Sequence, residues 1–163
     1  MPANFDEIML RPERPADALF LFELYASTRQ QELEATGWPV ALQEAFLRTQ
    51  FNAQSLGYKN TFPNAEFAII SLGPQAVGRI VINRAENEIR LVDIALLPVH
   101  RGRGMGTELM RQLLREAAAA KKPVRLSVLK GQRAFRLYQR LGFQKSGEAD
   151  LRDQMEWLPQ NNP

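Results

Sequence analysis

The chain has 163 residues, a length typical of one domain, and a formal charge of +3 from 21 Lys+Arg against 18 Asp+Glu. The absence of cysteine excludes disulfides, thiolate metal sites and a cysteine nucleophile, and the single histidine, His100, excludes a multi-histidine metal centre. No apolar run reaches the roughly 18 residues of a membrane-spanning helix, and Asp6 and Glu7 are unlike a secretory signal, so we expect a cytoplasmic protein with neither membrane nor metal partner.

The first part of the chain predicts one short strand followed by two helices. Residues 8–11 form a strand candidate that prolines end, and the apolar pattern that follows predicts a helix over about 16–29. A Gly-Trp-Pro break at 37–39 comes next. A second helix is then expected, closed by Gly57 and Pro63. Five apolar residues form its predicted stripe: Leu42, Ala45, Phe46, Leu47 and Phe51.

Three strands are predicted next, over residues 67–70, 77–82 and 89–97. Short breaks separate them, so an antiparallel meander is expected. The third run is apolar on both of its alternating faces apart from Asp93. This pattern is typical of a strand that is covered on both sides and lies near the centre of its sheet.

The second part of the chain alternates helices and strands. A helix is predicted from Met105 to about Ala117, on apolar residues at every fourth position. A strand over 124–129 follows, which we expect to lie parallel to the one ending at Leu97 because a helical crossover joins them. A further helix is expected to stop at Gly142.

A last strand pair over 143–148 and 151–158 completes the predicted elements. The order predicts an α/β domain of three layers with a mixed sheet, mostly antiparallel and with one parallel pair. We expect a single domain over residues 1–158 and a polar tail over 159–163.

The net charge hides an uneven distribution. From residue 100 to 140, eleven basic residues stand against two acidic ones, so this segment carries +9 and the rest of the chain −6. Such asymmetry indicates two kinds of partner, with solvated helix faces as the alternative interpretation. The total is too weak to require nucleic acid as a partner.

Residues 101–106 read Arg-Gly-Arg-Gly-Met-Gly, between a buried strand and a helix. The first N–H groups of a helix lack internal partners, and glycine lets its backbone approach a phosphate, so this turn predicts an anion site. It is not a Walker loop, which needs Gly-Lys-Ser/Thr. It is not a Rossmann fingerprint either, because Thr107 or Leu109 stands where the third glycine is required.

Two motifs together point to a family. The turn, as Arg-x-x-Gly-x-Gly, directly follows the strand end at 93–98, and residues 137–143 read Leu-Tyr-Gln-Arg-Leu-Gly-Phe. This pair resembles the GNAT superfamily of acyl-CoA-dependent N-acetyltransferases, over residues 88–143. The resemblance implies the GNAT fold, acetyl-CoA as co-substrate and an amine as acceptor.

The resemblance also implies site residues. The backbone of Ile94, Ala95 and Leu96 would pair with the pantetheine arm, and Gln132 would supply an amide near the coenzyme. Tyr138 would protonate the departing thiolate, which is chemically reasonable because a thiol has a pKa near 8.5 and a phenol near 10. The turn would bind the coenzyme phosphates with Arg101, Gly102, Arg103, Gly104, Met105, Gly106 and Thr107.

The composition favours direct transfer in a ternary complex. There is no cysteine, and His100 has no serine partner by spacing, so a covalent acyl-enzyme is not expected. His100 is expected at the solvent rim of the turn. Asp93 has two interpretations, a base for the amine or a polar residue satisfied by neighbouring backbone.

Several features of the acceptor side stay open. The resemblance places acceptor contacts on the segments that carry Glu23, Tyr25, Arg29, Glu32 and Trp38. The acceptor is a protein N-terminus, a lysine, a polyamine, an amino acid or an antibiotic. If the basic segment meets the coenzyme, the acidic remainder faces the acceptor and favours a cationic amine.

An alternative function is a non-catalytic coenzyme-binding or regulatory module with the same fold. It stays open because Gly131 and Gln132 stand where many GNAT members carry asparagine. Nucleic acid is not expected as a partner, since coenzyme phosphates account for much of the basic charge. A homodimer is a reasonable expectation for such a domain.

Overall fold

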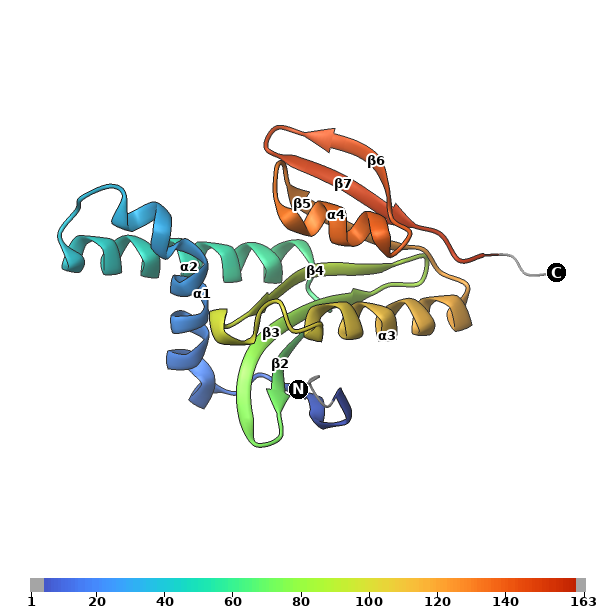
Figure 1. Cartoon of the computed structure of the whole chain (residues 1–163), viewed down its shortest axis with the longest axis horizontal. Helices are drawn as coiled ribbons and strands as arrows, with labels where there is room; N and C mark the ends of the chain where they lie inside the picture. Colours follow the sequence, from blue (N-terminus) through green and yellow to red (C-terminus); the bar gives the residue numbers. More distant parts are fainter. Residues whose placement is uncertain (1–4, 161–163) are drawn as a thin grey trace.

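The computed structural model describes residues 5–160 and contains one seven-stranded sheet with helices on both faces (Figure 1). The order of strands and helices is the predicted one, and the α/β fold class is confirmed. The elements are β1 (Ile8–Pro12), α1 (Ala18–Glu34), α2 (Val40–Thr61), β2 (Glu66–Leu72), β3 (Gln75–Arg84), β4 (Ile89–Leu96), α3 (Met105–Ala120), β5 (Val124–Leu129), α4 (Arg133–Arg140), β6 (Gln144–Ala149) and β7 (Arg152–Trp157).

The strands lie in the order β1-β2-β3-β4-β5-β7-β6. β2, β3 and β4 form the predicted antiparallel meander, and β4 is the central strand. β4 and β5 form the parallel pair that the helical crossover predicted, and the remaining neighbours are antiparallel. The fold therefore places one parallel junction in the middle of an otherwise antiparallel sheet.

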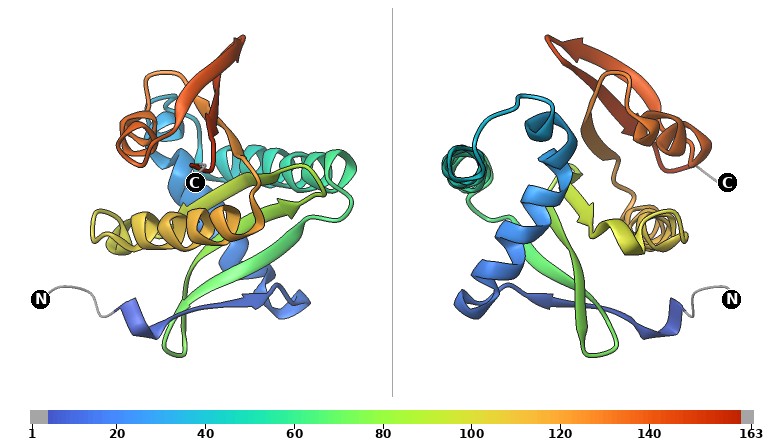
Figure 2. Two further views of the ribbon diagram at one scale, coloured as in Figure 1. Left: turned by 90° about the vertical axis from the view of Figure 1, so that its right-hand side faces the viewer. Right: turned by 60° about the vertical axis from the view of Figure 1, so that its left-hand side comes forward.

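Helices cover the two faces of the sheet in pairs. α1 and α2 lie on one face, and α3 and α4 lie on the other (Figure 2). The predicted period of four is confirmed in α3, where Met105, Leu109, Leu113 and Ala117 are buried in the main hydrophobic core. Among residues 5–160, no helix has the length and hydrophobicity that crossing a bilayer requires.

The second helix differs from its prediction in length and in burial. α2 continues through Gly57 to Thr61, and none of its residues is buried. Leu42 is 51% and Phe46 39% exposed, because the first turns of α2 extend beyond the sheet together with the end of α1 (Figure 1). Helical spacing predicts which residues share a face, whereas the covering partner depends on the tertiary fold.

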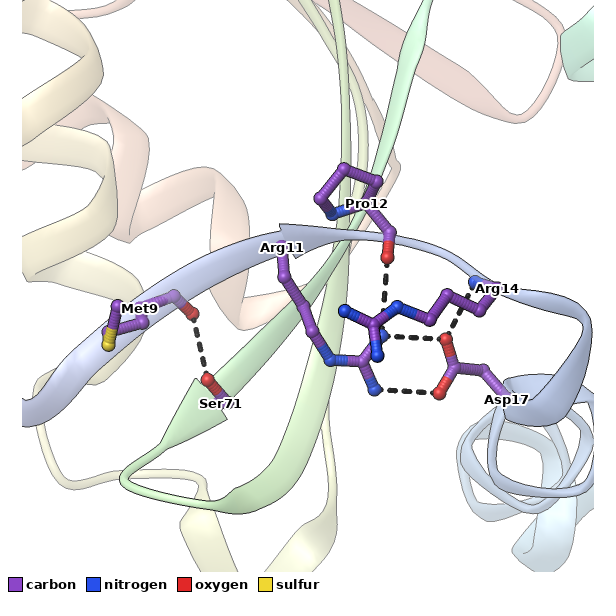
Figure 3. Close-up of polar contacts among 6 residues, drawn as sticks. All are labelled: Met9, Arg11, Pro12, Arg14, Asp17 and Ser71. Atoms are coloured by element: carbon purple, nitrogen blue, oxygen red, sulfur yellow. Dashed lines mark hydrogen bonds and ion pairs between the residues drawn. The ribbon is translucent and has the colours of Figure 1, made fainter.

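An ion pair fixes the start of α1 against the first strand. Arg11 of β1 donates two hydrogen bonds to the Asp17 carboxylate, at 2.8 and 2.7 Å, and the backbone N–H of Arg14 donates a third (Figure 3). These hydrogen bonds lower the pKa of Asp17 to about 2, with the Arg11 contact as the main cause. The hydroxyl of Ser71 also donates to the carbonyl of Met9, which ties β1 to β2.

Candidate functional site

The site is built on a gap in the sheet. β4 and β5 pair only from Ile89 to Leu91, opposite 124–126, and form no further pairs beyond that point. At the same place β4 carries an extra residue, Val92, because Leu91 faces Ile82 and Asp93 faces Val81. A bulge bends its strand, so the two strands separate here.

A cavity of about 320 Å³ occupies this gap. Predicted residues Asp93, Ile94 and Ala95 line it from β4, and residues 127–129 face them from β5. Both helical layers contribute to its wall, with Thr28, Arg29, Glu32, Gln54 and Tyr58 from α1 and α2 and with Gln132, Ala134 and Tyr138 from the opposite layer. The cavity therefore reaches both faces of the sheet, and a ligand from each face can meet another inside it.

Tyr138 lies in this cavity, as its motif predicts. It is 7% exposed, and its ring packs against Phe143 with the centroids 5.6 Å apart. Burial, and then the negative charge of Asp93, raise the pKa of Tyr138 to about 12. The hydroxyl therefore keeps its proton at neutral pH and is able to donate a hydrogen bond into the cavity.

A buried arginine holds Asp93 on the other side of the cavity. Arg79 Nη2 lies 2.9 Å from Asp93 Oδ2 and 3.3 Å from Gln54 Oε1. Glu13 is a second carboxylate, 4.0 Å from Arg79, and burial raises the pKa of Glu13. Of the two interpretations of Asp93, the backbone partner is not what the structure shows, because the carboxylate pairs with the Arg79 side chain, and the role as a base stays a prediction.

Sequence reasoning missed several residues of the cavity. Tyr58, Gln54 and Arg152 line it, and burial with the charge of Asp93 raises the pKa of Tyr58 to about 12. Nothing in their spacing distinguishes them, since each stands in a helix or strand pattern of its own. They come together only because α2 and the start of β7 both reach the cavity beside β4.

The glycine-rich turn has the backbone expected of an anion site. Gly102 and Gly104 adopt φ values of +72° and +85°, which side chains rarely tolerate, and α3 begins directly after them. The first hydrogen bond of this helix runs from the N–H of Glu108 to the Gly104 carbonyl, at 3.0 Å. The N–H groups of Met105, Gly106 and Thr107 therefore precede the helical hydrogen-bond ladder and are available to an anion.

Gly106 has space beside it that the protein does not fill. It has an ordinary helical backbone, and a Cβ placed there would meet no described atom within 4 Å outside its own helix. Internal packing therefore does not require glycine at this position. The open space is what the close approach of a phosphate to the N–H groups requires.

The two arginines of the turn lie differently. Arg101 donates from Nε to the Leu96 carbonyl, at 2.8 Å, and reaches Ser27 Oγ at 3.3 Å, so its guanidinium faces the end of β4 and α1. Arg103 is exposed and has no hydrogen bond or ion pair among residues 5–160. Arg103 is therefore the more available donor for a phosphate.

His100 is not at the solvent rim, and that prediction is wrong. It is 8% exposed, and neither ring nitrogen has a hydrogen-bond partner within the described chain. His100 is the last residue of the turn Pro98–His100 and is buried there, whereas residues 101–104 after it are exposed.

Only some of the residues on the segments expected to contact the acceptor lie at a pocket in the structure. Arg29 and Glu32 line the cavity, and Tyr25 lies in a smaller neighbouring pocket with Arg79 and Asp93. Glu23 and Trp38 line neither of these two pockets.

Comparisons with known proteins agree with this geometry. The structure of PaiA N-acetyltransferase from Thermoplasma acidophilum, in complex with coenzyme A, superposes with a TM-score of 0.68 at 17% identity, covering 93% of this chain and 98% of the other. An acetyltransferase from Thermus thermophilus gives 0.68 at 17% identity, with 97% and 99% covered. A chimera of the spermidine N-acetyltransferase SpeG from Vibrio cholerae with hSSAT gives 0.63 at 16% identity, with 93% and 95% covered. At these identities the similarity establishes the fold.

The family assignment comes from the sequence. No protein in a search of curated sequences matches this chain. Residues 63–145, slightly more than half of the chain, match the family model described as an acetyltransferase (GNAT) domain. This span runs from β2 into β6 and contains the gap, the turn and the tyrosine motif. The chain therefore belongs to the GNAT acetyltransferase family.

Proposed function

We propose that this protein transfers the acetyl group of acetyl-CoA directly to a primary amine, with both substrates bound at once. The observation that carries the proposal is the cavity at the β4–β5 gap, which residues of both helical layers line. Coenzyme entering from the α3–α4 side and acceptor entering from the α1–α2 side would meet in the plane of the sheet. No covalent acyl-enzyme is needed, because the cavity brings the two substrates together.

The pantetheine arm would lie along β4. Beyond Leu91 the backbone of this strand has no β5 partner. The Ala95 carbonyl faces Gly78 of β3, so by the alternation of a strand the N–H and C=O groups open to the amides of the arm are those of Ile94 and Leu96, and Ala95 would contact the arm without them. Leu96 would continue this contact, although its carbonyl already accepts a hydrogen bond from Arg101. Gln132, at the start of α4 and in the cavity wall, would add a side-chain amide.

The phosphates would occupy the start of α3. N–H groups of residues 102–107 and the free guanidinium of Arg103 fit a pyrophosphate, and the space beside Gly106 admits it. Three further cations of α4, Arg133, Arg136 and Arg140, have no ion pair within the described chain and lie on the same face of the sheet. The similar structure from Thermoplasma acidophilum is a complex with coenzyme A, which supports this coenzyme as the ligand.

The chemistry would be an addition and elimination at the thioester carbon. The neutral amine nitrogen forms the new C–N bond, the C–S bond breaks, and Tyr138 donates its proton to the departing thiolate. The nitrogen loses a proton to solvent, and Tyr138 regains one. The raised pKa of Tyr138 means that the hydroxyl is protonated when the thiolate forms, and it also makes the phenol a weaker acid, so the role rests on the place of Tyr138 in the cavity wall.

Two measurements test the proposal. Calorimetric titration with acetyl-CoA is expected to show binding, and an amine panel with acetyl-CoA is expected to release free thiol in proportion to an N-acetylated product. The absence of acetyl-CoA binding up to millimolar concentration would overturn the proposal. Coenzyme binding without transfer to any amine would instead support the alternative, a non-catalytic coenzyme-binding module.

A further inference from the structure

Charged side chains at the α1–α2 end of the cavity indicate which charged group the acceptor has in addition to its amine. Four of them line this end, two arginines and two carboxylates: Arg29, Arg152, Glu32 and Asp93. From their arrangement we infer that the acceptor is a small amine with a carboxylate of its own, which Arg29 and Arg152 bind while Asp93 faces the amine. This inference rests on the proposed function and adds the substrate class.

Arg29 lies against Tyr25, and its side chain makes no hydrogen bond within residues 5–160. Its guanidinium carbon lies 5.6 Å from the centre of the Tyr25 ring. Its nearest carboxylate oxygen belongs to Glu32, one turn further along α1, at 3.7 Å, which is beyond hydrogen-bond distance. A guanidinium has five N–H donors in a planar fork that matches a carboxylate. Those of Arg29 are therefore available at the cavity wall.

Arg152 reaches the same cavity from the first residue of β7. Its side chain is exposed, and its only side-chain hydrogen bond within the described chain is a long one of 3.5 Å from Nη1 to the Ser127 carbonyl. The protonated hydroxyl of Tyr58, in the same wall, adds a further donor. Two arginines from distant parts of the chain therefore converge on one cavity with most of their donors unused.

The carboxylates at this end are less available to a second cation. Asp93 already balances the buried guanidinium of Arg79, at 2.9 Å, and Glu32 stands next to Arg29. Two arginines therefore offset the two carboxylates at this end of the cavity, so the acidic surplus outside residues 100–140 is not concentrated here. These residues favour an acceptor that carries an anion besides its amine over the cationic amine expected from the charge distribution. A polyamine carries several positive charges and no anion, so it would place its second ammonium near unpaired guanidinium groups.

Matched acceptor pairs provide the test. Glycine, β-alanine, 4-aminobutyrate and L-glutamate would each be compared with the corresponding carboxamide, alongside spermidine and O-phosphoethanolamine, by thiol release with acetyl-CoA. Converting the acid to the amide lowers the pKa of the amine and raises the share of reactive free base. A preference for the acid therefore runs against intrinsic reactivity and reports binding of the carboxylate.

We expect at least one acid to have a kcat/KM tenfold or more above that of its amide and above that of spermidine. Arg152→Gln and Arg29→Gln should each reduce this preference about tenfold, mainly through KM for the acid, and leave KM for acetyl-CoA unchanged. Arg48→Gln is the matched control, because Arg48 pairs with Glu44 on α2 and lies outside the cavity wall. It should leave the preference intact.

Binding separates this inference from the proposed function. Titration of the acids into protein saturated with coenzyme A needs no turnover, and binding lost in Arg152→Gln supports the inference even if no acetyl group is transferred. The inference would be overturned if the amides or spermidine had a kcat/KM equal to that of the acids, or if the preference for the acid survived both substitutions. Either result would leave the proposed acetylation of amines in place. Faster turnover of O-phosphoethanolamine than of every acid would overturn the carboxylate assignment.

Discussion

Arg79 and Asp93 form an ion pair between neighbouring strands at the edge of the cavity, with Nη2 of the arginine 2.9 Å from Oδ2 of the aspartate. The arginine is 4% exposed, whereas the aspartate reaches the cavity wall. Phe51 and Tyr58 of α2 cover the guanidinium, each with its ring centre 5.9 Å from the guanidinium carbon. The pair thus links the packing of α2 on the sheet to the position of Asp93, the carboxylate of β4 that lines the cavity.

Replacing Arg79 by methionine should destabilise the fold strongly. Asp93 and Glu13, both half-buried, would lose the positive charge of Arg79, and a carboxylate left without its partner away from water costs about 3 kcal/mol. Urea unfolding measures the loss. The control Arg48→Met removes an exposed pair with Glu44 and should change the free energy of unfolding by less than about 1 kcal/mol. Equal stability of the two variants would contradict the central role of Arg79.

A single methyl group at Gly106 should separate coenzyme binding from folding. The position is helical and a Cβ meets no neighbour, so Gly106→Ala should leave stability unchanged or raise it by up to about 1 kcal/mol. It should weaken acetyl-CoA binding at least tenfold, because the methyl group occupies the space beside the first N–H groups of α3. Gly57→Ala in α2 is the matched control, since its Cβ is equally free. Unchanged acetyl-CoA affinity in Gly106→Ala, measured by calorimetry, would move the phosphate site elsewhere.

Tyr138→Phe should lower kcat about 100-fold or more while KM for acetyl-CoA changes little. The ring and its packing on Phe143 are retained, so the free energy of unfolding should stay close to that of the unmodified protein. Because the pKa of Tyr138 is about 12, the unmodified enzyme should show no decline in kcat from this residue below about pH 11. An alkaline decline near pH 9 that disappears in the variant would refute this protonation state, and an unchanged kcat would refute the general-acid role.

The parts of the fold that could be predicted are those encoded locally. The period of four in α3 reflects a buried face, which the structure confirms, and the apolar run of β4 predicts the central place that this strand has in the sheet. Only Ile89 and Leu91 of β4 are buried, because the rest of the strand borders the cavity. The exposed stripe of α2 was not predictable, because Leu42 and Phe46 show the same spacing whether or not another element covers them. The same holds for the burial of His100, which depends on how a short turn packs.

The two halves of the candidate site differ in the same way. The coenzyme half is nearly continuous in sequence, running from the end of β4 through the turn into α3, so a short motif can represent it. The acceptor half is assembled from α1, α2, β4 and β7, and Tyr58 and Arg152 become neighbours in one cavity only after folding. Sequence reasoning located the segment that carries Arg29 and Glu32 but had no signal for the residues that complete this wall.

The ion pair between Arg11 and Asp17 predicts a pH dependence of stability (Figure 3). The pKa of Asp17 is about 2 in the fold against an ordinary value of 3.8, so the folded chain binds this proton less tightly than the unfolded chain. The pair therefore contributes fully above about pH 4, and its contribution is lost as the pH falls through about 2.

Asp17→Asn should accordingly lower the free energy of unfolding by about 1 kcal/mol at neutral pH, because a charge-assisted contact is lost. Urea unfolding at a series of pH values should show the difference from the unmodified protein shrinking between about pH 4 and pH 2. Glu44→Gln, which removes an exposed carboxylate paired with Arg48 on α2, should cause a smaller loss throughout. A difference for Asp17→Asn that stays constant down to pH 2 would show that the carboxylate charge does not hold β1 against α1.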